Sequence, residues 1–241
     1  MQKRVIVILL VLAALFPAFM AAVALHEGSA LAHGIAGMVT GLIILWVFGA
    51  GSLMWRLRNP VRDAVRRIPL NWRLKFVLFC ILLACAEEAV TVTLTNMAPV
   101  FGAKIGEAYI TASTNYLDVI LFHSVIVFVP LFIALMLILG RYDLSPFAVF
   151  LIFGIVGTIC EVIYIAGPSV LLGFPMWAFV YGLMAWLPAY SLPPAEQRGA
   201  RPARWYHAIL AVPAIFILAL PLLRPIIFVI TSVLKHPSTH F

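Results

Sequence analysis

Charged residues are scarce in this chain. They make up 10% of its 241 residues, whereas 64% are hydrophobic and the mean hydropathy is +1.11. A soluble domain is about 25% charged and about 45–50% apolar. The shortage of charge excludes an ordinary soluble domain, and no polar segment is long enough to form a second domain. The sequence therefore predicts one integral membrane domain that covers residues 1–241.

Cysteine is also rare, and several motifs are missing. Cys80, Cys85 and Cys160 all lie inside apolar stretches, with no zinc-finger or CxxC spacing. A disulfide framework is therefore not expected. The chain has no Walker motif, none of the His-rich boxes of membrane desaturases, and no lysine in the middle of its last apolar stretch. These absences exclude the P-loop NTPases, the desaturases and the rhodopsins.

Apolar stretches are what the chain has in abundance. A helix needs about 20 apolar residues to cross a bilayer. Seven stretches approach or exceed that length, at about residues 4–25, 31–55, 74–98, 117–140, 145–167, 171–190 and 207–231. The predicted fold class is all-α, a polytopic transmembrane helical bundle, and the predicted location is the cell membrane.

The first stretch has a second interpretation. Lys3 and Arg4 precede it, and Ala22, Val23 and Ala24 lie near its end, a pattern that also fits a cleavable signal peptide. The length of the apolar run favours a retained span.

Basic residues lie mainly on one side of the predicted spans. Two precede the first span, seven separate the second from the third, one follows the fourth, and three follow the sixth, which makes thirteen of the sixteen. Because Lys and Arg collect in cytoplasmic loops, we predict a cytoplasmic N-terminus and an outer C-terminus. The net charge of +7 is then a mark of topology and not of nucleic-acid binding. The expected partners are membrane lipids, with other membrane proteins or a second copy of the chain as alternatives.

Ionisable side chains inside spans are costly to insert and point to function. Five qualify, namely Glu87 and Glu88 in the third span, His123 in the fourth, Glu161 in the fifth and Arg224 in the seventh. At 1.5 Å per residue, Glu88 lies about 15 Å from the outer end of its span, and His123 and Glu161 lie roughly 9 Å from theirs. We predict that these groups form one catalytic cluster in the outer half of the bilayer.

The direction of each glutamate can also be predicted. Glu161 shares a helical stripe with Gly154, Gly157 and Thr158. Small residues mark places where membrane helices approach closely, so Glu161 is expected to face inward. Two adjacent helical residues point about 100° apart. We therefore expect one of the neighbouring glutamates of the third span to face the cluster and the other to reach a different helix.

Three functions remain open on this pattern. The first is a membrane-embedded enzyme for a lipid or isoprenoid substrate, with Glu88 and Glu161 in acid–base roles and Arg224 stabilising an anion. The second is a proton- or ion-coupled transporter, although the chain shows no internal repeat. The third is an accessory or scaffold subunit, in which Glu88 or Glu161 pairs with Arg224 to specify packing.

Histidines offer a possible metal or haem site, although the sequence specifies no cofactor. The candidate ligands are His26, His33 and His123, and a haem held by His33 and His123 is one arrangement among these. Gly28 and Ser29 are expected to break the helix between His26 and His33. The simpler interpretation is that these two are polar side chains at an interfacial turn.

Other polar residues have simpler expected roles. Asn115 and Asp118 are expected to cap the start of the fourth span. His236 and His240 are expected to lie in an exposed C-terminal tail.

The paired glutamates resemble one known motif. Glu87 and Glu88 on a membrane helix are similar to the paired glutamate of intramembrane CAAX-type proteases. The arginine that follows the pair in that family is missing, since Ala89 through Thr93 contain none, and Val119 stands where the family has a phenylalanine four residues before its histidine, here His123. The resemblance is confined to this fragment and does not assign the chain to the family.

Overall fold

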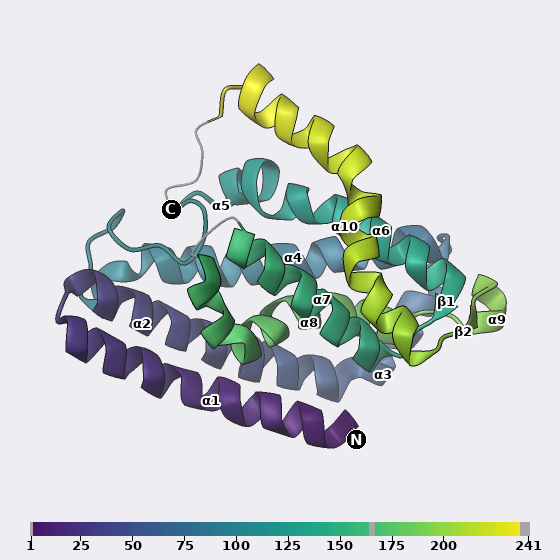
Figure 1. The fold of residues 1–241 in the computed structure, drawn as a ribbon, viewed down its shortest axis with the longest axis horizontal. Coiled ribbons are helices and arrows are strands. Elements are labelled where there is room, and N and C mark those ends of the chain that lie inside the picture. Colours follow the sequence, from purple (N-terminus) through teal and green to yellow (C-terminus); the bar gives the residue numbers. More distant parts are fainter. Residues whose placement is uncertain (1, 164–166, 237–241) are drawn as a thin grey trace.

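The fold is a bundle of long helices. The computed structural model describes residues 2–163 and 167–236 (Figure 1). The first half contains α1 (Gln2–Glu27), α2 (Ala30–Leu42), η1 (Ile43–Ala50), α3 (Gly51–Arg67), α4 (Trp72–Asn96), η2 (Ala98–Phe101), α5 (Tyr116–Asp118) and η3 (Val119–His123). The second half contains α6 (Val125–Arg141), β1 (Tyr142–Asp143), α7 (Pro146–Glu161), η5 (Gly167–Gly173), α8 (Phe174–Tyr190), α9 (Ala195–Arg198), β2 (Arg201–Pro202), α10 (Trp205–Phe228) and η6 (Val229–Val233).

Five helical segments are long and apolar enough to cross a membrane. A sixth forms if the segment of α5 and η3 (Tyr116–His123) and the helix α6, which meet at a 48° bend, count as one span. The helical class and the multi-pass character are therefore as predicted, but the number of spans is five to six by length and composition. The stretch expected at 145–167 gives the 16-residue helix α7, which is short for a span.

The turn between the first two helices follows the sequence prediction. Gly28 has φ +65°, a left-handed conformation that glycine adopts without strain. The Ser29 hydroxyl then accepts a hydrogen bond from the amide of Ala32 and caps α2. His26 and His33 consequently lie on different helices. Beyond this turn, α2, η1 and α3 form one helix over Ala30–Arg67.

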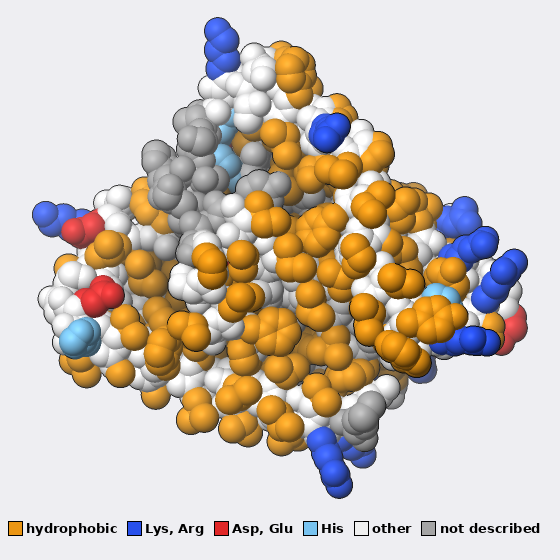
Figure 2. Space-filling model, viewed as in Figure 1, with side chains coloured by type: hydrophobic (Ala, Val, Ile, Leu, Met, Phe, Trp, Pro, Cys, Tyr) orange, Lys and Arg blue, Asp and Glu red, His pale blue; other side chains and the backbone are white. Residues whose placement is uncertain are grey.

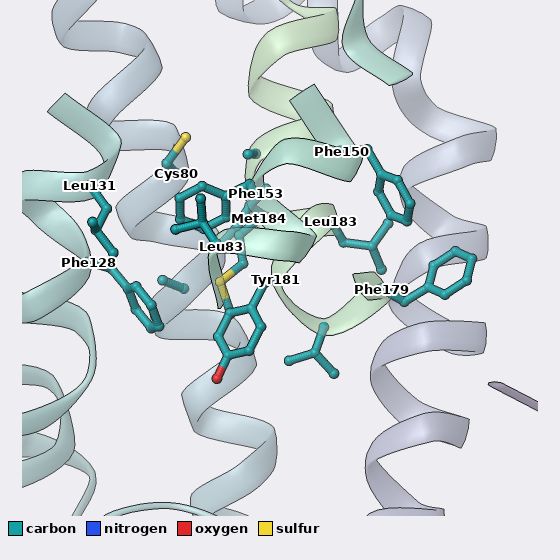
Figure 3. Close-up of a cluster of buried hydrophobic side chains, with 14 of the residues drawn as sticks. Cys80, Leu83, Phe128, Leu131, Phe150, Phe153, Phe179, Tyr181, Leu183 and Met184 are labelled. Carbon is teal, nitrogen blue, oxygen red and sulfur yellow. The ribbon is translucent and has the colours of Figure 1, made fainter. Parts of the chain in front are cut away.

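The centre of the bundle is the pair α7 and α8. Gly154 lies directly against the backbone of Ala178, and Gly182 lies against the Phe150 ring and backbone. Small residues at these positions let the helices approach closely. Aromatic side chains fill the space around the pair (Figure 3), and the rings of Phe132 and Phe153 stack with centroids 4.9 Å apart.

The outer surface of the bundle is largely apolar. Figure 2 shows hydrophobic side chains across the middle of one face, with Lys and Arg at its margins. Many large side chains are exposed along α1 and α10, including Leu15, Leu25, Ile209 and Ile217. A continuous exposed apolar surface of this kind suits contact with lipid rather than with water.

A buried arginine joins three segments at the end of the bundle where α6 stops. The Arg198 guanidinium donates hydrogen bonds to the carbonyls of Leu139 and Pro193 and to the Asp143 carboxylate. The two-residue strands β1 and β2 pair in parallel beside it. This bond network fixes the loop that leads into α10, and so the base of the helix that borders the site described next.

Candidate functional site

A cavity of about 320 Å³ lies between α4, the segment that follows it, η3, the start of α6, α7, α8 and the end of α10. Its polar lining comes from far apart in the chain, and its apolar lining includes large side chains of α6, α8 and α10. The residues that line it are Leu42, Glu87, Glu88, Thr91, Ile110, Thr111, Ala112, Phe122, His123, Ser124, Val127, Phe128, Cys160, Glu161, Trp177, Tyr181, Ile227, Ile230, Thr231 and His236. Four of the five predicted site residues therefore meet at one cavity.

Glu88 is held in place by hydroxyl groups. Its Oε2 accepts hydrogen bonds from the Thr111 hydroxyl at 2.9 Å and the Thr91 hydroxyl at 3.0 Å. Ser124 lines the same cavity and also interacts with this carboxyl. Thr91 lies one turn along α4, as helical spacing predicts, whereas Thr111 reaches the carboxyl from the loop after η2. The side chain is 5% exposed, so its orientation is set by these partners.

The two carboxyl oxygens of Glu161 differ in their hydrogen bonding. The Tyr181 hydroxyl of α8 donates a hydrogen bond to Oε1. Oε2 is buried, with no hydrogen-bond partner among the residues that the structure describes. An unsatisfied buried polar atom costs about 1–3 kcal/mol, so natural proteins keep few of them. Glu161 also lines the cavity, so this oxygen belongs to a residue of the cavity wall.

Glu87 faces the same cavity. It is 4% exposed, and no hydrogen bond joins its carboxyl to any other side chain in the described part of the protein. It interacts electrostatically with both Glu88 and Glu161. The expectation that only one of the adjacent glutamates reaches the cluster is therefore wrong. The cavity is wide enough to take two side chains that leave the helix in different directions.

His123 lies at the end of the wide helical turn η3. The amide of Ser124 donates to the carbonyl of Val119 at 2.9 Å, which is an i→i+5 bond. His123 Nε2 lies 3.5 Å from Asp118 Oδ2, and the His236 Nε2 lies 2.7 Å from Asp118 Oδ1. The expectation of an exposed tail is wrong for His236, whose side chain is 18% exposed; His240 lies outside the described residues.

The structure does not bring three of the predicted residues to the cavity. Arg224 is exposed on α10, and no ion pair joins it to a glutamate within residues 2–163 and 167–236. His26 and His33 are exposed at the α1–α2 turn, where His33 Nδ1 is 2.8 Å from the carbonyl of Ser29. The turn interpretation holds for these two histidines, and they do not join His123.

Several residues of the cavity were missed from the sequence. Tyr181, Thr111 and His236 carry no pattern that links them to α4 or α7. Tyr181 sits within the aromatic core, and its hydroxyl points away from the other labelled side chains (Figure 3). Asn115 caps α5 as expected, because its Oδ1 accepts from the amides of Leu117 and Asp118.

The bundle and its apolar surface define the class of the protein, a multi-pass α-helical membrane protein. No family model, curated protein or solved structure matches the chain.

A second cavity of about 500 Å³ lies at the opposite end of the bundle, between α1, η1, α3, α7 and α8. Its walls are apolar and its only ionisable residues are Lys3 and Arg56. None of the residues that line it carries a carboxyl or imidazole group, whereas the smaller cavity has both.

Gly157 gives a direct test of how Tyr181 is placed. A Cβ atom at this position would overlap the Tyr181 ring, because the helices α7 and α8 touch here. We expect Gly157→Ala to push Tyr181 away from Glu161 and to destabilise the protein by about 1–3 kcal/mol. Gly140→Ala is the matched control, since its Cβ would meet Trp72 at an ordinary 3.5 Å. Thermal unfolding in detergent measures both, and equal stability of the two variants would contradict the packing described.

Proposed function

We propose that the protein is a membrane-embedded enzyme that performs acid–base chemistry on an amphiphilic substrate, a lipid or an isoprenoid. The observation that carries the proposal is the convergence of Glu87, Glu88 and Glu161 on one largely apolar cavity. Enzymes that transfer protons commonly use two titratable groups whose different surroundings make one an acid and the other a base. An apolar wall is what a hydrocarbon chain requires.

The roles of the two best-placed glutamates follow from their hydrogen bonds. Glu161 lines the cavity and its Oε2 has no hydrogen-bond partner among the described residues, so we assign to this residue the exchange of a proton with the substrate. Glu88, oriented by the hydroxyls of Thr91 and Thr111, is the second acid–base group. Tyr181 positions Glu161 through the bond to Oε1. Arg224 takes no part, because it lies outside the cavity.

The surroundings of the cavity favour a lipid substrate. Ile227, Ile230 and Thr231, near the C-terminal end of α10 and in η6, form part of the lining. Neighbouring residues on the same helix, such as Phe228 and Val233, are 61% exposed and so suited to contact with acyl chains. This part of α10 extends beyond the rest of the bundle (Figure 1). A substrate that enters beside it comes from the bilayer and not from water.

The transporter alternative needs a polar path through the whole bundle. The cavity is bordered instead by Phe128 and Tyr181, whose ring centroids are 5.4 Å apart. The Phe128 ring also contacts Phe132 and Phe153, which are fully buried and stacked on each other. This aromatic layer counts against transport. The scaffold alternative needs direct pairs between glutamates and arginine, and the described residues contain none for Glu88 or Glu161.

The test is a search for lipid turnover. Purified protein is placed in vesicles made from a total membrane lipid extract, with polyisoprenyl lipids added, and the lipids are compared by mass spectrometry over time. We expect the wild type to convert one lipid class and Glu88→Gln to leave it unchanged while remaining folded. Proton flux into the vesicles without any change in lipids would contradict the proposal and support transport.

A further inference from the structure

A second group of side chains lies at the rim of the same cavity and has ligand chemistry of its own. Asp118, His123 and His236 each offer one ligand atom, and these three atoms lie within 4.8 Å of one another. They come from α5 and η3, in the middle of the chain, and from the residues after η6, more than a hundred positions later. Two imidazoles and one carboxylate form a donor set typical of zinc and related divalent transition metals.

Two unusual helical turns bring these residues together. In an α-helix, residues five apart point about 140° away from each other. The i→i+5 bond between Val119 and Ser124 widens the turn and brings His123 back over Asp118. At the other end of the chain, the amide of Leu234 makes the same kind of bond to Val229, at 2.9 Å. Wide turns of this type occur often at functional sites.

The third ligand is held by its neighbours. Lys235 has φ +49°, an uncommon left-handed conformation for a residue other than glycine, and it reverses the chain after η6. The amide of His236 then bonds to the carbonyl of Ile230 at 3.0 Å. The His236 ring stacks on Phe122, with centroids 4.5 Å apart, and meets the edge of the His123 ring at 5.0 Å.

The distances suit a small ion. Zinc–nitrogen bonds of about 2.0–2.1 Å in a tetrahedral arrangement place ligand atoms about 3.3 Å apart. Asp118 oxygens lie 2.7 Å from His236 Nε2 and 3.5 Å from His123 Nε2, on either side of that value. All three residues are part-buried, which limits competition from water without closing the approach.

We propose that Asp118, His123 and His236 form a binding site for one divalent transition-metal ion of the zinc type. Three protein ligands leave the fourth position of a tetrahedral ion open, as in catalytic rather than structural zinc sites. Because His123 and His236 also line the cavity, an ion held here borders it. His26 and His33, the other metal candidates of the sequence, are not part of this site.

The test is metal binding by the purified full-length protein in detergent, without a histidine tag. The protein is stripped with a chelator and titrated with Zn²⁺ and with Co²⁺, whose visible absorption reports tetrahedral coordination. We expect one equivalent to bind, with no displacement by excess Mg²⁺, which prefers oxygen ligands. His123→Ala and His236→Ala should each lower the affinity for Zn²⁺ by at least about 100-fold. Loss of a residue that only hydrogen-bonds a metal ligand costs about 10–100-fold, and loss of a ligand itself should cost at least as much.

His33→Ala is the matched control, because His33 is an exposed histidine with a bond to its own helix turn. It should bind Zn²⁺ as the wild type does. Absence of stoichiometric binding by the wild type would overturn the inference, as would unchanged affinity in His236→Ala. In either case the contacts of Asp118 with the two histidines serve only to hold the residues after η6 against α5 and η3. The readout is binding alone, so its failure leaves the proposed acid–base function untouched.

Discussion

Glu161→Gln is expected to reduce lipid turnover by about 10²–10⁴-fold, the usual contribution of a positioned acid–base group. Glutamine keeps the shape of the side chain and can still accept the Tyr181 hydrogen bond at its amide oxygen. What it loses is the ability to take up or release a proton. The substitution therefore separates proton transfer from packing, and the variant should remain folded in detergent with a retention volume like that of the wild type.

Glu27→Gln is the control for this experiment. Glu27 is exposed at the end of α1 and does not line the cavity. Its replacement changes the same functional group and should leave turnover within about twofold, as expected for a surface position. Full activity of Glu161→Gln would contradict the assigned role, and equal losses in the two variants would show that the effect is not specific to the cavity.

Removing the polar pair in the cavity wall is expected to stabilise the protein. Glu161 Oε2 is buried without a described partner, which costs stability. Glu161→Met combined with Tyr181→Phe removes both partners of the Oε1 bond and the unsatisfied oxygen while keeping similar volumes. Replacing a buried polar pair with apolar groups of the same shape is neutral or stabilising. We expect a gain of about 2–3 kcal/mol in the free energy of unfolding, together with complete loss of turnover.

The measurement is thermal unfolding of the double variant beside wild type and Glu161→Met alone. The single variant should be less stable than the double variant, because it leaves the Tyr181 hydroxyl buried without its acceptor. If the glutamate were a packing device, as the scaffold alternative requires, the double variant would be the least stable of the three. A gain in stability with a loss of activity is the pattern of a functional site.

The fold class was predictable because composition decides it. Hydrophobic stretches of bilayer length indicate helices, and the Gly28 and Ser29 break was visible because glycine and a capping serine have strong local preferences. The number of spans was less predictable. Residues 117–140 form two helical segments that meet at a 48° bend at Ser124. The bend could not be predicted, because no glycine or proline stands at that residue.

The candidate site was predictable only in part. Glu87, Glu88, Glu161 and His123 stood out because ionisable groups are rare within apolar stretches. Arg224 stood out for the same reason but lies on an exposed face of α10, and depth alone does not determine direction. His236 was missed because its position depends on the wide turn η6 and the left-handed Lys235, features that sequence periodicity does not encode.

A high-resolution map of the protein purified with its native lipids tests the central claim most directly. If the cavity is a substrate site, the map shows elongated density inside it, with a polar end beside Glu88 and Glu161 and a tail toward Ile227 and Ile230. A cavity that is closed by side chains, with Glu88 or Glu161 paired directly to a basic residue, would contradict the claim and leave the carboxyl groups as packing devices.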